Sequence, residues 1–196
     1  MNSDLEKSFL SVCKIASEYD LIRSSSGNLS IRDSENSMLI KGSGAWMRYM
    51  NREDISYCSW DNGNFNVLNS VKPSIEYPLH ISVYKERADV THVLHFQAPY
   101  ATALSASDYS GNYDVIVEIP YYCYPIASIG YFPPGSSELA DAIKNEIKNG
   151  ANVIQMKNHG QVAVADSADK LLRRCIFFEL ACQIIVLSGN KARTII

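Results

Sequence analysis

The chain has 196 residues, of which 46% are hydrophobic and 20% are charged, and its formal net charge is −3. This composition is typical of a globular protein, and the length predicts a single domain that spans residues 1–196. The negative charge argues against nucleic acid or a membrane surface as a partner, and no apolar run approaches the roughly 20 residues that cross a bilayer.

The N-terminal segment Met1-Asn2-Ser3-Asp4 has no cationic stretch followed by an apolar one, so the sequence predicts a cytoplasmic protein. In chain order, the first half predicts a helix, two hairpins and a second helix, at residues 3–19, 29–32 with 38–40, 56–60 with 65–68, and 73–87. Asp61-Asn62-Gly63-Asn64 is the turn of the second hairpin. Ser74 is the predicted N-cap of the second helix, with Glu76 in its first turn, where a carboxylate favours the helix dipole.

The second half mixes strands and helices. The pattern predicts a strand, a helix, a strand, a helix, a hairpin and a last helix, at residues 90–96, 98–107, 114–119, 135–148, 151–156 with 161–165, and 166–189. Asn158-His159-Gly160 is the tight turn of that hairpin. This order indicates an α/β fold in which a mixed or largely antiparallel sheet is covered by helices on both faces.

The five cysteines are odd in number and show no Cys-x-x-Cys spacing, which argues against a disulfide framework and a zinc knuckle. We expect all of them to be structural, because free cysteine mostly behaves as a small buried apolar residue.

Two histidines stand where a metal ion could bind. Because side chains alternate along a strand, His95 and Gln97 share one face and His92 takes the other, where we expect a structural role. His159 lies in a tight turn that can present its imidazole to a cleft, and Gly160 beside it tolerates a positive φ. Several converging nitrogen and oxygen ligands with one open position characterise a catalytic metal site.

Taken one at a time, these signals are weak. A single histidine is more often a structural residue, and the turns Gly27-Asn28 and Gly42-Ser43-Gly44 alone are more often plain turns than phosphate sites. Phosphate would be bound there by backbone N–H groups, hydroxyls and helix N-termini.

The order of the motifs adds what the single motifs lack. Five segments follow one another along the chain: Gly27-Asn28-Leu29-Ser30-Ile31-Arg32, Ile40-Lys41-Gly42-Ser43-Gly44, Lys72-Pro73-Ser74-Ile75-Glu76, the run from His92 to Ala103, and Asn158-His159-Gly160. In content and order they resemble the class II aldolase/adducin family over roughly residues 5–187. That family includes fuculose-phosphate and rhamnulose-phosphate aldolases, ribulose-phosphate 4-epimerases and methylthioribulose-phosphate dehydratases.

The resemblance implies a three-layer α/β/α sandwich and a homotetramer with active sites between subunits. It also implies a bound divalent metal ion, most often zinc, and assigns roles to nine residues. The metal ligands are His95, Gln97 and His159, the acid/base is Glu76, and the phosphate pocket is lined by Gly27, Asn28, Ser43, Gly44 and Ser74. The aldolase proton donor, a tyrosine from an adjacent subunit, is left open among Tyr113, Tyr121, Tyr122 and Tyr124.

Two positions depart from the family pattern. Gln97 stands where the family has a second strand histidine, and an amide oxygen is a harder and weaker ligand than imidazole. Manganese or another divalent ion is therefore an alternative to zinc. Ile75 stands where the family often has the second serine of Ser-Ser-Glu, which removes one hydroxyl from the phosphate pocket.

The resulting hypothesis is a metal-dependent lyase that cleaves a small phosphorylated ketose, such as a fuculose-1-phosphate-like sugar, in a retro-aldol reaction. The metal would stabilise the enediolate as a Lewis acid, and Glu76 would move the proton. The alternatives are a sugar-phosphate 4-epimerase or dehydratase of the same family, or a catalytically silent adducin-like interaction module, which Gln97 keeps open. His80, four residues after Glu76, is predicted either to orient that carboxylate or to pack the helix.

Overall fold

The computed structural model describes residues 3–61 and 63–195, so part of the N-terminal segment and Asn62 of the predicted turn lie outside the described residues. Its centre is an eight-stranded sheet in the order β4-β3-β2-β1-β5-β8-β7-β6. The strands are β1 Asn28–Ser34, β2 Ser37–Lys41, β3 Ile55–Asp61, β4 Asn64–Val67, β5 His92–Phe96, β6 Ile126–Ile129, β7 Val153–Met156 and β8 Gly160–Ala165. Among the strands of the described residues, only β6 and β7 pair in parallel, which confirms the predicted mixed, largely antiparallel sheet.

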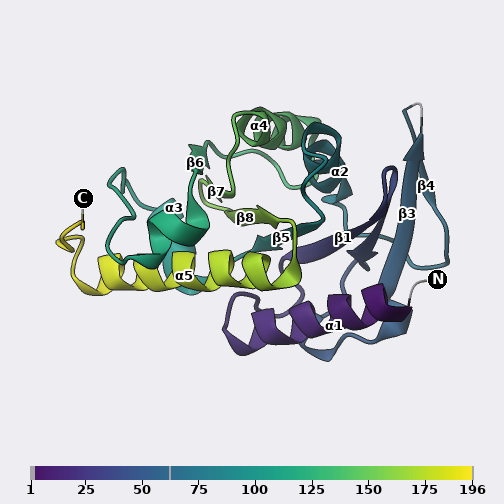
Figure 1. Ribbon diagram of the computed structural model, residues 1–196, viewed down its shortest axis with the longest axis horizontal. Coiled ribbons are helices and arrows are strands. Elements are labelled where there is room, and N and C mark those ends of the chain that lie inside the picture. The colour runs from purple at the N-terminus through teal and green to yellow at the C-terminus, as the bar shows by residue number, and fades with distance from the viewer. Residues whose placement is uncertain (1–2, 62, 196) are drawn as a thin grey trace.

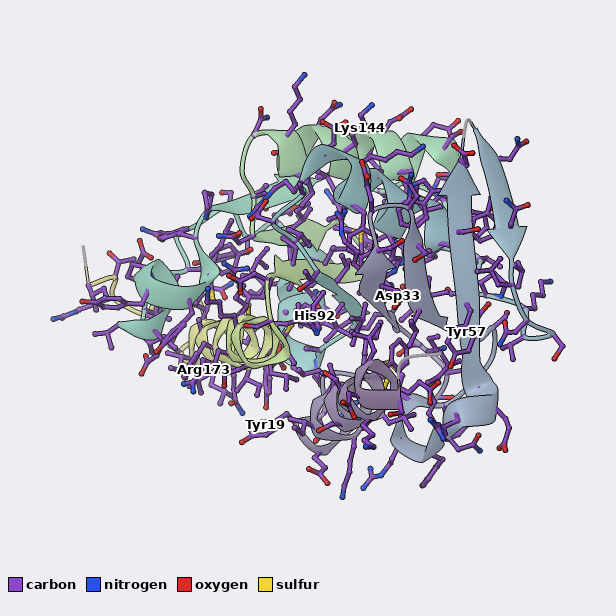
Figure 2. All side chains as sticks on the ribbon, turned by 45° about the vertical axis from the view of Figure 1, so that its right-hand side comes forward. Tyr19, Asp33, Tyr57, His92, Lys144 and Arg173 are labelled. Atoms are coloured by element: carbon purple, nitrogen blue, oxygen red, sulfur yellow. The ribbon has the colours of Figure 1, made fainter. Side chains whose placement is uncertain are left out.

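Helices cover both faces of the sheet (Figure 1). They are α1 Ser3–Glu18, α2 Tyr77–Glu86, α3 Pro99–Ser105, α4 Ser137–Lys148 and α5 Ala168–Leu187, with short turns η1 Met47–Tyr49, η2 Arg52–Asp54 and η3 Ile119–Cys123. α2 and α4 pack on one face, and α1, α3 and α5 pack on the other. Figure 2 shows the two outer layers through Lys144 on α4 and Arg173 on α5, which lie on opposite sides of the sheet. The three-layer α/β/α sandwich is therefore confirmed.

Alternation along β5 divides its side chains between the two cores. Leu94 and Phe96 pack in the cluster under α1, α3 and α5, whereas Val93 packs in the cluster under α2 and α4. His95 therefore faces the α2 side, as its spacing from Val93 requires. All five cysteines are buried and free, as predicted.

The predicted start of the second helix is wrong. α2 begins at Tyr77, and the N-cap position is occupied by Glu76, whose side chain makes no capping hydrogen bond. The cause is tertiary: Ser74 donates its N–H to the carbonyl of Lys41 at 3.0 Å, and Gly42 bridges to Pro73. These contacts hold residues 73–75 against the end of β2, so the helix starts later.

The predicted strand at residues 114–119 is also wrong. This segment forms bends and turns that lead into η3, whose residues pack on α5. The sequence analysis missed β6, a four-residue edge strand that pairs with β7. Among the helices of residues 3–61 and 63–195, none has the length and apolar character that a membrane crossing requires.

Candidate functional site

Three side chains from distant parts of the chain meet at one end of the sheet. His95 comes from β5, His159 from the turn between β7 and β8, and Glu76 from the start of α2. Each offers one ligand atom, and these atoms all lie within 4.8 Å of one another. Glu76 and His95 are buried, with 6% and 1% of their surface exposed.

Two glycines allow the backbones to approach closely enough to form this site. A Cβ on Gly160 would lie 2.5 Å from the carbonyl oxygen of Phe96, and one on Gly27 would lie 2.6 Å from the carbonyl oxygen of His95. Both glycines also have a positive φ, which L-residues with a side chain rarely adopt. The predicted role of Gly160 in the His159 turn thus has a steric basis as well as a conformational one.

The hydrogen bond of His95 fixes which ring nitrogen faces the site. Its Nδ1 lies 2.9 Å from the carbonyl oxygen of Gln161, which can only accept, so Nδ1 carries the hydrogen. Nε2 of the neutral ring then carries a lone pair and no hydrogen, and it lies 3.3 Å from Oε2 of Glu76. Two acceptors at this distance need a cation between them, and backbone support of this kind is typical of metal-binding histidines.

Glu76 also has a buried carboxylate oxygen that accepts no hydrogen bond from the described residues. Its Oε1 is buried without a hydrogen-bond partner among the described residues, and it lies 3.3 Å from Nε2 of His159. Nδ1 of His159 is likewise buried without a partner there. Two imidazoles and a carboxylate, one of whose buried oxygens has no hydrogen-bond partner, fit a divalent cation that keeps open coordination positions.

The charge states at this site also suit a metal ion. Burial raises the pKa of Glu76, but the imidazoles of His95 and His159 and the amide of Asn28 outweigh that effect and lower the pKa to about 2. Burial lowers the pKa of His95. At neutral pH the site therefore offers an ionised carboxylate and a neutral imidazole, the forms that bind metals.

The metal-ligand cluster lies in a cavity of about 250 Å³. All nine residues that the sequence predicted for the site line this cavity: Gly27, Asn28, Ser43, Gly44, Ser74, Glu76, His95, Gln97 and His159. Gln97 follows the last residue of β5 and is half-buried. A Cβ added to Gly160 would lie 2.8 Å from Cγ of Gln97. The Gln97 side chain therefore packs over the turn that contains His159.

The sequence analysis missed Lys41, a buried lysine that also lines the cavity. Its Nζ donates to the carbonyl of Ser25 at 2.8 Å, and burial lowers its pKa. The available signal was a lone cation immediately before the Gly42-Ser43-Gly44 turn. Gln161 was missed too, and its side-chain oxygen accepts from the N–H of Ala98 at 3.2 Å.

The remaining histidines lie outside the cavity lining. His92 is on the opposite face of β5, and its Nδ1 lies 2.7 Å from the hydroxyl of Thr91. His80 is fully buried and contacts Asn28 and Ser30. Among the described residues, no hydrogen bond or ion pair joins it to Glu76, although both lie at the α2 end of the site.

A family model described as Class II Aldolase and Adducin N-terminal domain matches residues 7–186. The chain belongs to the class II aldolase and adducin family. The resemblance on which the sequence analysis depended is therefore confirmed, as is the fold it implied.

Members of the class II aldolase and adducin family that resemble this chain differ in their named reactions. The chain is 30% identical over 183 residues to an L-fuculose phosphate aldolase from Methanococcus maripaludis, covering 93% of this chain and 96% of the relative. It is 29% identical over 175 residues to a 3-oxo-tetronate 4-phosphate decarboxylase from Haemophilus influenzae, and the match covers 85% of this chain and 80% of the relative. A solved L-fuculose 1-phosphate aldolase superposes with a TM-score of 0.84 at 25% identity, covering 100% of this chain and 91% of that one.

Proposed function

We propose that this protein is a divalent-metal-dependent lyase that cleaves a small phosphorylated ketose, such as a fuculose-1-phosphate-like sugar, by a retro-aldol reaction. The observation that carries the proposal is the cluster of Glu76, His95 and His159 in a cavity that is also lined by a buried lysine and four serines. The family match and the similarity to L-fuculose phosphate aldolases support it.

His95, His159 and Glu76 would hold the metal ion, with the amide oxygen of Gln97 as a further ligand. A bound divalent ion would supply Lewis-acid stabilisation of the negative charge that develops on the substrate's oxygens. Zinc suits the two imidazoles, and manganese or another oxygen-tolerant ion suits the carboxylate and the amide.

Glu76 is the proposed acid/base, and its two oxygens have different surroundings. Oε2 accepts a hydrogen bond from Nδ2 of Asn28 at 2.8 Å, whereas Oε1 has no such partner among the described residues. We therefore assign metal binding to Oε2, which faces Nε2 of His95, and proton transfer to Oε1, which can accept a proton from a substrate hydroxyl and return it to carbon. Because the pKa of Glu76 is lowered to about 2, its basic form is populated at neutral pH.

The phosphate of the substrate is proposed to lie between the 25–28 and 41–44 segments and Ser74. The N–H groups of Ser43 and Ser74 are already used, because they donate to the carbonyls of Lys72 and Lys41 at 2.8 and 3.0 Å. Because these two N–H groups are occupied, we assign phosphate binding to the hydroxyls of Ser43 and Ser74 and to Nζ of Lys41. The positive charge of Lys41 would also favour phosphorylated over unphosphorylated sugars.

Among the described residues that line the cavity there is no tyrosine. An aldolase proton donor would thus come from an adjacent subunit, in line with the proposed homotetramer. Ile75 at the cavity rim is 58% exposed, and a neighbouring subunit would cover it. The proposal also keeps a single domain and a cytoplasmic location, which the five buried free cysteines fit.

The decisive experiment is an assay of the purified protein on a panel of phosphorylated ketoses, with each divalent ion added in turn. Retro-aldol cleavage should release a triose phosphate and an aldehyde, and Glu76→Gln should abolish it. Cleavage that is equally fast after complete chelation of the metal would contradict the proposal. An absence of turnover on the whole panel would favour the silent adducin-like module.

A second reaction deserves a place in the panel because of the similarity to the 3-oxo-tetronate 4-phosphate decarboxylase. Decarboxylation of a 3-oxo acid, like retro-aldol cleavage, breaks a C–C bond and leaves negative charge next to a carbonyl. The same metal site would serve both. Release of CO2 from a 3-oxo-tetronate 4-phosphate, without ketose cleavage, would replace the aldolase by a decarboxylase. Interconversion or dehydration of a pentulose phosphate would indicate an epimerase or a dehydratase.

A further inference from the structure

Two rows of polar side chains face each other behind the candidate metal site. Asn28 and Ser30 are two residues apart on β1, so they point to the same side of the strand. Glu76, His80 and Tyr84 are spaced by four residues along α2 and its N-cap, so they form one stripe. All five are buried.

These residues form a continuous chain of hydrogen bonds that ends on Glu76. Nδ2 of Asn28 donates to Oε2 of Glu76 at 2.8 Å. Oδ1 of Asn28 contacts Nε2 of His80, whose Nδ1 lies 2.7 Å from the hydroxyl of Ser30. The Ser30 hydroxyl in turn lies 2.7 Å from the hydroxyl of Tyr84.

The acceptor at the Glu76 end fixes the direction of every bond. A carboxylate can only accept, so the NH2 group of Asn28 faces Glu76 and its oxygen faces His80. Nε2 of His80 must then donate. Burial lowers the pKa of His80 to about 3, so the ring is neutral and its Nδ1 accepts from the Ser30 hydroxyl.

We propose that His80 is a positioning residue that orients the Asn28 amide and, through it, holds the Glu76 carboxylate in place for metal binding and proton transfer. The proposal rests on the proposed function. His80 is not among the described residues that line the cavity, so its effect must pass through Asn28. The sequence analysis left open whether His80 orients Glu76 or packs the helix; the hydrogen bonds favour orientation, by an indirect route.

Loss of the His80 donor would free the Asn28 amide to rotate. A reversed amide would place Oδ1 against the ionised Oε2 of Glu76, where two acceptors repel each other. The carboxylate would then lose its 2.8 Å hydrogen bond and its fixed orientation. Outer groups that orient metal ligands typically change metal affinity by about 10- to 100-fold when removed.

The test compares His80→Leu, which removes the donor, with His80→Gln, which places an N–H donor near the position of Nε2. His92→Leu is the matched control, because His92 is a buried histidine on the opposite face of the sheet. Affinity is measured by absorption titration with Co2+, whose visible bands also report the ligand geometry. The NH2 resonances of Asn28 are followed by NMR in the metal-free protein.

We expect His80→Leu to weaken Co2+ binding by about 10- to 100-fold, with altered bands. The Asn28 NH2 signals should also lose their protection from exchange with water. His80→Gln should recover most of both effects, and His92→Leu should change neither. On a substrate found in the panel, kcat should fall while KM holds, because the groups to which phosphate binding is assigned, the hydroxyls of Ser43 and Ser74 and Nζ of Lys41, are intact.

A folded His80→Leu variant with unchanged Co2+ affinity and unchanged Asn28 signals would overturn the proposal. If His80→Leu does not fold, a folded His80→Phe variant, which also lacks the donor, would overturn it equally if its Asn28 signals and Co2+ affinity match those of the wild type. Should the wild-type protein bind no Co2+ at all, the proposed function fails, whereas the Asn28 signals still decide the role of His80.

Discussion

Nδ1 of His95 lies 2.9 Å from the carbonyl oxygen of Gln161, the residue of β8 that pairs with Phe96. This contact leaves Nε2 as the only nitrogen of His95 that can bind a metal ion, and it points that nitrogen at Glu76. The ligand is thus oriented by the hydrogen-bonding pattern of the sheet itself. Metal affinity should therefore depend on residues of the strand pair as well as on the ligands.

His95→Ala should reduce the affinity for divalent ions by more than about 100-fold, beyond the loss typical of a supporting residue, because it removes one of two imidazole ligands. Elemental analysis of the purified protein and Co2+ titration would measure the change. His92→Ala, on the other face of the same strand, is the control and should retain the metal. Equal metal content in the two variants would argue against the site.

Gln97→His should tighten zinc binding, because imidazole is a better zinc ligand than an amide oxygen, and it should shift the preference from Mn2+ toward Zn2+. Competition titrations with the two ions would measure the shift. Gln97→Ala separates the effect of the new ligand from that of removing glutamine. If histidine and alanine give the same zinc affinity, the side chain at this position does not reach the ion.

The local patterns predicted most elements, and the misses share one cause. The hairpin pairing of β3 with β4 and the alternation in His92–Phe96 follow from local signals, and both predictions are confirmed. The strand predicted at 114–119 and the missed β6 depend on long-range pairing: β6 is a strand only because β7 lies beside it. Short apolar segments carry too little periodicity to distinguish such cases.

The residues of the candidate site likewise fall into those that the sequence could predict and those that required the structure. His95, His159 and Glu76 came from motif order, which reflects the family. Lys41 was missed because a single lysine before a turn predicts nothing until its burial is known. The role of Asn28 beside Glu76 also required coordinates, because the β1–β5 register that sets Asn28 opposite His95 cannot be derived from either segment alone.

Gly160→Ala should destabilise the protein by about 1–3 kcal/mol, the usual cost of adding a methylene where there is no room. The new Cβ would lie 2.5 Å from the carbonyl oxygen of Phe96, a backbone atom that cannot move aside easily. Gly130→Ala is the control, because its Cβ would meet nothing within 4 Å, and it should stay within about 0.5 kcal/mol of the wild type. Urea unfolding measures both; equal stabilities would show that the His159 turn can relax.

The buried histidines should make the metal-free protein less stable in acid. The pKa of His80 falls from 6.5 to about 3 on folding because burial disfavours the imidazolium, and the pKa of His92 falls to about 4 for the same reason. Below pH 6.5 the unfolded chain binds protons that the folded chain does not, so stability is lost as the pH falls through this window. Each group contributes a slope of up to about 1.4 kcal/mol per pH unit.

Urea unfolding followed by tryptophan fluorescence at several pH values would isolate these contributions. His80→Gln should flatten the profile between pH 6.5 and about 3, whereas His92→Gln should flatten it only down to about pH 4. Below pH 4 only the His80 variant should keep its reduced slope. If the profiles of both variants run parallel to that of the wild type, the two rings are protonated in the folded protein. The hydrogen bond from Nε2 of His80 to Oδ1 of Asn28 could persist in that case. Nδ1 of His80, however, would have to donate to the Ser30 hydroxyl instead of accepting from it.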